Sequence, residues 1–202
     1  MGANTTVIRI HDERAVAILS QLDVDNQETF THSKRVLGGC FRFARVLGLS
    51  RAETDDLCYG ALLHDVGKCF IDLGVLRKPG ALSEEDRWLL STHPGKGAEL
   101  AARHGFGKAV TDTILSHHER WDGGGYPRRL AGDAIPFSAR VVSLVDAYDT
   151  IISKRAYDPP RAVAVAVSEI EKNAGAQFDP ALAELYLSKL RRKHYKQLSK
   201  GA

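Results

Sequence analysis

The sequence is poor in several features that mark whole classes of protein. Its 202 residues include only three cysteines, Cys40, Cys58 and Cys69, whose odd number and unpaired spacing argue against a disulfide framework. It has no apolar run long enough to span a bilayer and no secretory signal peptide, so we expect no membrane association and a cytoplasmic location. The net charge of +3 is too small to indicate binding to a nucleic acid polymer.

The composition that remains is that of an ordinary folded domain. Hydrophobic residues make up 44% of the chain and charged residues 26%, which is enough apolar material for a packed core. No internal repeat or low-complexity linker interrupts the sequence. We therefore expect one domain over residues 27–202, preceded by a short helical extension over residues 1–26.

Apolar residues recur with helical spacing along most of the chain and almost never alternate with period two, which predicts an all-α fold of about eight helices. Ser50 with Glu53, and the acidic run after Ser83, are typical helix starts. Pro94 disfavours helical backbone in the preceding residue, so a helix is expected to end at His93. The expected helices are 12–22, 27–47, 50–67, 83–93, 95–103, 110–118, 136–152, 161–173 and one from 179 onward, with a loop over 73–80.

The stretch from Ser116 to Pro127 concentrates unusual chemistry. Two adjacent histidines are followed by Glu119 and then by three glycines, a tyrosine and a proline. Since a helix cannot continue through that run, it should end near His117. Adjacent histidines on a helix point about 100° apart, so they either bind two different ions or lie where the helix unwinds.

Ionisable residues also occur on or beside the apolar faces of other predicted helices. Glu28 and His32 are four residues apart and share one helix face. His64 and Asp65 follow an apolar run, and Asp146 lies on an otherwise apolar helix, although a buried carboxylate is strongly unfavourable without a cation. The candidates are Glu28, His32, His64, Asp65, His93, His117, His118 and Asp146.

Imidazole and carboxylate together suit Fe, Mn, Zn or Ni, and this many ligands exceeds what one tetrahedral ion needs. Two or three ions therefore fit better, the arrangement common in phosphoester hydrolysis. Three of these residues also have an ordinary alternative: His64 as a core histidine, Asp65 as a cap or paired with Lys68, and Asp146 paired with Arg140 or Arg155.

Two of these stretches, in this order, resemble the motifs of the HD-GYP family of cyclic-dinucleotide phosphodiesterases, a branch of the HD phosphohydrolases. They are His64-Asp65-Val66-Gly67-Lys68 and His117-His118-Glu119-Arg120-Trp121-Asp122-Gly123-Gly124-Gly125-Tyr126-Pro127, and the similarity extends from about Glu28 to Leu187. The resemblance implies an HD-domain helical bundle around a multinuclear centre of two or three divalent ions, Fe or Mn first, with Zn, Ni or Mg as alternatives. It also implies an enzyme of bacterial second-messenger signalling that hydrolyses a cyclic dinucleotide, cyclic di-GMP first, by attack of a metal-activated hydroxide on phosphorus.

The resemblance also assigns roles to individual residues. Asp65 would bridge two ions and, with Lys68, form the catalytic pair. The implied metal ligands are His32, His64, Asp65, His93, His117, His118 and Asp146, with Glu28 similar to the extra acid of three-metal members. The implied substrate-binding residues are Lys68, Arg155, Gly125, Tyr126 and Pro127.

The sequence departs from the family pattern at the expected phosphate-binding loop. Asp158 and Pro159 stand where two basic residues are common, and Arg129 and Ala131 stand where Gly and Lys are common. Two rival interpretations therefore stay open: an HD phosphohydrolase acting on another nucleotide, and a weakly active signalling effector that binds metal and nucleotide. Such an effector would use a protein partner at the Gly125–Pro127 loop, and a homodimer is a further expectation.

Overall fold

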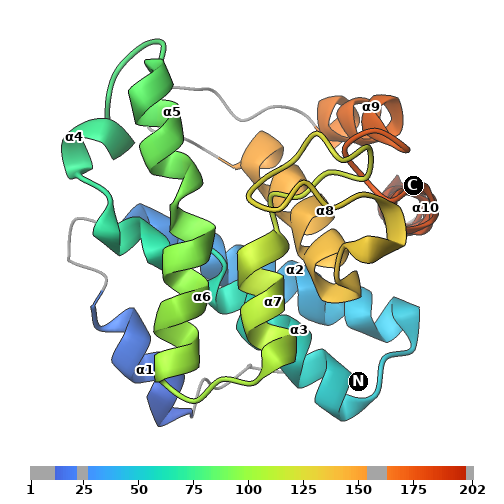
Figure 1. Ribbon diagram of the computed structural model, residues 1–202. Coiled ribbons are helices and arrows are strands. Elements are labelled where there is room, and N and C mark those ends of the chain that lie inside the picture. Colours follow the sequence, from blue (N-terminus) through green and yellow to red (C-terminus); the bar gives the residue numbers. More distant parts are fainter. Residues whose placement is uncertain (1–11, 22–26, 154–162, 199–202) are drawn as a thin grey trace.

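The computed structural model describes residues 12–21, 27–153 and 163–198, and most of these residues are helical (Figure 1). Within these ranges the only β pairing is an isolated bridge between Ala174 and Phe178, so the predicted all-α class is confirmed. The elements in chain order are α1 (Glu13–Leu19), α2 (Gln27–Leu47), α3 (Arg51–Leu63), the 3-10 helix η2 (Val66–Phe70), α4 (Leu73–Leu76), α5 (Glu84–Ser91), α6 (His93–Arg103), α7 (Lys108–Ser116), the 3-10 helix η3 (Gly132–Ala134), α8 (Phe137–Ile152), α9 (Val163–Asn173) and α10 (Pro180–Leu198).

The helix starts follow the capping signals in the sequence. The Ser50 side chain accepts the backbone N–H of Glu53, and the Glu53 carboxylate accepts the Ser50 N–H, so both halves of a capping box are present at α3. Ser83 and Asp86 form the same arrangement at α5. These reciprocal bonds satisfy N–H groups that the first turn of a helix leaves unpaired.

Two hydrophobic clusters share α2 and α3. One joins them to α8, α9 and α10 through residues such as Phe43, Leu144 and Leu182. The other joins them to α1, α6 and α7 through residues such as Leu62 and Ile114. Because α2 and α3 contribute to both clusters, the other helices pack against the same central pair. The ends of these helices therefore meet beside α2 and α3.

Glycine allows α2 and α8 to cross closely. A Cβ placed on Gly39 would lie 2.5 Å from a methyl carbon of Val145, which is closer than real side chains approach. The absence of a side chain at this position therefore lets the two helix backbones meet. This contact sets His32 on α2 near Asp146 on α8.

Two local predictions are wrong. His93 does not end a helix; it is the first residue of α6, and Pro94 lies in the first turn, where its missing N–H costs nothing. Residues 73–80 are not all loop, because α4 forms over Leu73–Leu76 with the Asp72 side chain accepting the Gly74 N–H. The Asp72 cap permits the short helix α4, whereas α6 begins without a side-chain cap and with its proline in the first turn.

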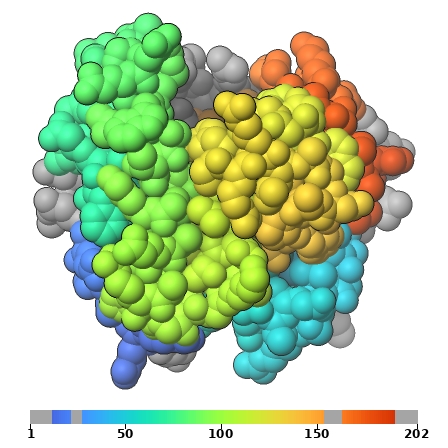
Figure 2. Space-filling model, in the orientation of Figure 1, coloured from blue at the N-terminus to red at the C-terminus, as the bar shows by residue number. Residues whose placement is uncertain are grey.

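The loop that follows α7 lies on the surface of one face (Figure 2), and the N–H groups of Trp121 and Asp122 donate to the carbonyls of Gln177 and Ala176, just before α10. Among the described helices, none combines the length and the apolar character needed to cross a membrane.

Candidate metal centre

The centre of the site is the junction of α3 and η2. The last turns of α3 bury Leu57, Ala61, Leu62 and Leu63, and the chain then turns without leaving the interior. His64 and Asp65 are consequently 1% and 3% exposed. A carboxylate buried to this degree requires cationic partners to stay charged.

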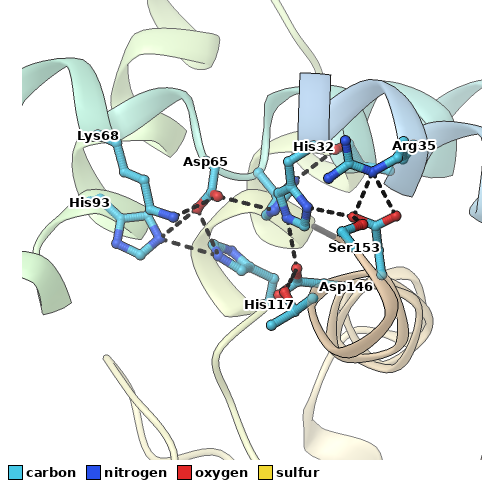
Figure 3. A network of polar contacts seen from close by, with 12 residues as sticks. His32, Arg35, Asp65, Lys68, His93, His117, Asp146 and Ser153 are labelled. Carbon is cyan, nitrogen blue, oxygen red and sulfur yellow. Dashed lines mark hydrogen bonds and ion pairs between the residues drawn. The ribbon is translucent and has the colours of Figure 1, made fainter. Parts of the chain in front are cut away.

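Asp65 is surrounded by histidines from three other segments (Figure 3). Its Oδ1 lies 3.3 Å from His93 Nε2 and 4.0 Å from His117 Nε2, and its Oδ2 lies 3.5 Å from His64 Nε2. Lys68, one turn further along η2, places its Nζ 2.6 Å from Oδ2. The expected pairing of Asp65 with Lys68 is therefore present, together with the histidines.

Two potential ligand groups share this carboxylate. One group is Asp65, His93, His117 and His118, and the other is His32, His64 and Asp65; within each group the ligand atoms lie within 4.8 Å of one another. The adjacent histidines both join the first group because His117 is the C-cap of α7 and His118 lies in the turn beyond it. Of the two arrangements expected for this pair, the one in which the helix unwinds is observed.

Backbone carbonyls fix the tautomer of three of the rings. His64, His93 and His117 each place Nδ1 at 2.6–2.8 Å from the carbonyl oxygen three residues earlier. A carbonyl oxygen only accepts hydrogen bonds, so each Nδ1 donates and the Nε2 of the neutral ring carries a free lone pair. The three lone pairs consequently belong to nitrogens near Asp65, as in metal sites whose histidines are oriented by the other ring nitrogen.

The arrangement of these nitrogens is unfavourable without a cation. His93 Nε2 and His117 Nε2 lie 3.3 Å apart although both rings donate through Nδ1, so two lone pairs face each other. His64 Nε2 is buried and has no hydrogen-bond partner among the described residues. Burial lowers the pKa of His64 and His117, and lowers that of His118 to about 4, so all three rings are neutral near pH 7. These residues fit divalent metal ions.

Asp65 itself stays ionised. Burial opposes its charge, but Lys68, His64 and His93 outweigh this effect and hold the pKa of the carboxyl well below its usual value. An ionised carboxylate shared by two histidine groups has the charge and the two oxygens needed to bridge two cations.

A second part of the site joins α2 to α8. His32 Nε2 lies 2.8 Å from Asp146 Oδ1, and His32 Nδ1 lies 2.8 Å from Asp149 Oδ2. Arg35 bonds both oxygens of Asp149 through its Nε. Burial works against protonation of His32, but Asp146 and Asp149 outweigh it and raise the pKa of His32 to about 9. Asp146 does not pair with Arg140, which binds Asp133 and Asp179 instead.

The loop after α7 is held against the cluster by Glu119, which is 2% exposed. Its two carboxylate oxygens accept the backbone N–H groups of Arg128 and Leu130. Tyr126 stacks on His118, with ring centroids 4.8 Å apart and planes at 24°. A side chain at Gly125 would overlap the backbone of Glu119, so this position requires glycine.

The remaining predicted site residues lie outside the two potential ligand groups or outside the described residues. Glu28 is exposed in the first turn of α2 and belongs to neither potential ligand group. Pro127 is exposed at the loop surface. Arg155, Asp158 and Pro159 lie outside the described residues.

Sequence reasoning gave no role to Asp149 or Glu119. Asp149 follows Asp146 by about one helical turn, a spacing that places both carboxylates on one face of the helix but does not show that this face meets His32. Glu119 is adjacent to the paired histidines, but nothing in the sequence indicates that its carboxylate accepts two distant N–H groups.

Comparison with known proteins assigns this chain to a family. The family model described as "HD domain" matches residues 17–182, and the chain belongs to this family. A "Cyclic di-GMP phosphodiesterase" of Vibrio cholerae is 42% identical over 69% of this chain and 30% of its own length. A "3'3'-cGAMP-specific phosphodiesterase 2" of the same organism is 34% identical over 84% of this chain and 33% of its own length.

The HD-GYP resemblance is also confirmed. A solved structure of a Bdellovibrio bacteriovorus protein, described as an HDG"Y"P protein, is 25% identical and superposes with a TM-score of 0.66 over 88% of this chain and 57% of that one. The chain spans about a third of the length of the two curated relatives.

Proposed function

We propose that this chain is a metal-dependent phosphodiesterase that hydrolyses a cyclic dinucleotide, with cyclic di-GMP as its substrate. The observation that carries the proposal is the sharing of Asp65 between two groups of histidines, of which His64, His93 and His117 are oriented by backbone carbonyls. A carboxylate with this environment suits a bridged pair of divalent cations, which is the usual centre for phosphodiester hydrolysis. The names of the relatives support the substrate class.

The proposed ligands are those that meet at the two groups, together with Asp146 through its contact with His32. They are His32, His64, Asp65, His93, His117, His118 and Asp146, with Glu28 as the proposed additional ligand of a third ion. Nitrogen and carboxylate donors favour Fe or Mn over thiolate-preferring ions. When bound, such ions lower the pKa of water and offset phosphate charge.

The protein's own groups would hold and orient the substrate. Lys68 has a 27% exposed side chain at the edge of the buried cluster, so its ammonium can contact a phosphate oxygen while it stays near Asp65. Asp149 and Arg35 fix the ring of His32 from the side opposite Asp146. Gly125 and Tyr126 form the wall beside His118 and are proposed to contact the substrate.

The names of the relatives give two candidates for the cyclic dinucleotide that this chain hydrolyses. One relative is named for cyclic di-GMP and another for 3'3'-cGAMP, which makes 3'3'-cGAMP the second candidate. The two molecules differ in one base, so residues that contact a base, and not the metal cluster, must discriminate between them.

The test is an assay of the anaerobically purified protein, loaded with Fe²⁺ or Mn²⁺, against cyclic di-GMP, 3'3'-cGAMP and cyclic di-AMP. We expect cyclic di-GMP to be consumed with the highest kcat/KM, with products separated by chromatography. Lys68→Ala should lower activity without reducing metal content, whereas Lys78→Ala, remote from the cluster, should not. Full metal loading without hydrolysis of any of the three would favour the signalling effector instead.

Three further expectations stay predictions. They are the boundary between residues 26 and 27, a homodimer, and a signalling protein that binds the Gly125–Pro127 loop.

A further inference from the structure

The cavity between α2, α8 and α10 has a chemistry that the proposed hydrolysis does not use. Its volume is about 310 Å³, at the lower end of the range for small-molecule sites. Lys34, Arg35 and Arg42 line it from α2, and Tyr148 and Tyr186 line it from α8 and α10. Among the described residues that line it, none is a proposed metal ligand.

The charge of the cavity is unbalanced. Three cationic side chains face one lining carboxylate, Asp149, which is already bonded to Arg35 and His32. Lys34 lies over the face of the Phe30 ring, 4.4 Å from its centroid, and has no ion pair with any described residue. Arg42 has no ion pair or side-chain hydrogen bond with any described residue. The cavity therefore has positive charge available for an anion.

The cavity is lined by more glycine than the packing of the helices requires. Gly38 and Gly39 both line it, and glycine inside a helix costs about 1 kcal/mol relative to alanine. The close approach of Val145 accounts for Gly39, but a Cβ on Gly38 would meet only the Arg42 guanidinium, at 3.3 Å. The helix contacts thus explain Gly39, whereas Gly38 lies beneath the guanidinium of Arg42.

Aromatic rings line the cavity from α8 and α10. The rings of Tyr148 and Tyr186 are in edge contact, with centroids 5.6 Å apart, and Phe43 supports Tyr186 from the core at 4.9 Å. Tyrosine faces are suited to stacking on a nucleobase, while guanidinium groups recognise phosphate through paired N–H donors. The residues from α2 therefore suit a phosphate, and the tyrosines from α8 and α10 suit a base.

We propose that this cavity is a second nucleotide site, and that it takes a nucleoside 5'-monophosphate with the phosphate on Arg42 and Lys34 and the base against Tyr148. The site goes beyond the proposed hydrolytic function and does not depend on it. It shares Arg35 with Asp149, whose carboxylate also holds His32, so the ligand would be sensed at the metal centre through a single ion pair.

The experiment is calorimetric titration of the full, metal-loaded chain with guanosine 5'-monophosphate and, separately, with inorganic phosphate. Losing one charge-assisted phosphate contact should weaken nucleotide binding about tenfold or more in Arg42→Ala. Arg45→Ala is the matched control, because Arg45 is exposed on the same helix but does not line the cavity. Melting temperature and metal content establish that both variants are folded.

A second measurement separates this cavity from the metal centre. Cross-linking with 8-azidoguanosine 5'-monophosphate should label peptides from residues 34–42 or 148–152, and the labelling should persist in Lys68→Ala. Equal nucleotide affinity in Arg42→Ala and Arg45→Ala would overturn the proposal. So would labelling confined to residues 64–68 and 117–127, or inorganic phosphate binding as tightly as the nucleotide, since the base would then contribute nothing.

Discussion

The backbone of Gly67 lies directly against the carbonyl group of His93. A Cβ at Gly67 would overlap that oxygen and would come within 2.7 Å of the Gly97 nitrogen, and both are backbone atoms that cannot move aside alone. This contact presses η2 onto α6 and holds Asp65 near the imidazole of His93. The glycine between His64-Asp65 and Lys68 is thus a packing requirement of the site.

Gly67→Ala should therefore weaken both the fold and the metal centre. Overpacking of this kind typically costs about 1–3 kcal/mol, and separation of η2 from α6 should reduce the metal content per chain. The measurements are denaturant unfolding and elemental analysis. Gly95→Ala is the control, because no atom lies within 4 Å of a Cβ there, and alanine in a helix should be neutral or stabilising by up to about 1 kcal/mol. Equal stability of the two variants would contradict this account of Gly67.

Glu119→Gln should loosen the loop that carries Tyr126. Both carboxylate oxygens of Glu119 accept a backbone N–H, and an amide must turn its own N–H₂ toward one of them. Leaving a buried donor unsatisfied costs about 1–3 kcal/mol. We expect lower stability and faster hydrogen exchange at the Arg128 and Leu130 amides. Glu99→Gln, on the exposed side of α6, should change neither; if Glu119→Gln leaves the exchange rates unchanged, the carboxylate does not hold the loop.

Much of the fold was predictable because the signals were local. The bounds of α2 coincide with the predicted helix over 27–47, and the capping boxes at Ser50 and Ser83 are formed as expected. The prediction that a helix ends at His93 was wrong because one local signal was given too much weight. The restriction that proline places on the preceding residue is a tendency, and a proline in the first turn of α6 is compatible with a helix beginning at His93.

The site was predictable as a set of residue types but not as a geometry. The sequence identified His64 and Asp65 as buried and ionisable, since they follow an apolar run. It could not show that Asp65 serves two groups of histidines, because that depends on how α3, α6 and α7 meet. The role of Asp149 escaped prediction for the same reason: helical spacing places it one turn from Asp146, but only the crossing of α2 and α8 shows that it reaches His32.

Asp65→Ala should remove metal and abolish hydrolysis. Asp65 is the one residue common to both potential ligand groups, and no neighbouring carboxylate can replace its two oxygens. Elemental analysis should show a loss of metal per chain. The control is Asp112→Ala, which removes a carboxylate that pairs with the exposed Lys108 on α7. Undiminished metal in Asp65→Ala would exclude Asp65 as a ligand.

Glu28→Ala tests the proposed third ion. Glu28 precedes His32 by one turn of α2 and is exposed, so its carboxylate is free to approach an ion bound beside that ring. We expect the variant to lose about one metal ion per chain while two remain, as in two-metal phosphoesterases. Glu84→Ala, another exposed first-turn acid, is the control. If Glu28→Ala and wild type bind the same number of ions, Glu28 only stabilises the start of its helix.

The charge of His32 in the metal-free protein should depend on Asp149. Burial lowers its pKa, but Asp146 and Asp149 outweigh burial and raise the pKa to about 9. Removing one carboxylate charge at 2.8 Å should lower the pKa by about one unit or more in Asp149→Asn. Titration of the imidazole C–H resonance by NMR measures this shift, with the resonance assigned from its absence in His32→Gln.

The pairing of His32 with Asp149 should also affect how the stability of the metal-free protein depends on pH. A histidine whose pKa is raised on folding contributes stability that is complete below the unfolded pKa of about 6.5 and is lost as the pH rises through the folded value. The free energy of unfolding of the metal-free wild type should therefore exceed that of Asp149→Asn by an amount that shrinks between about pH 6.5 and pH 9. The matched variant Asp112→Asn should show no such trend over this range. A constant difference for Asp149→Asn, with His32 titrating near 6.5 in both proteins, would mean that Asp149 orients the ring without sustaining its charge.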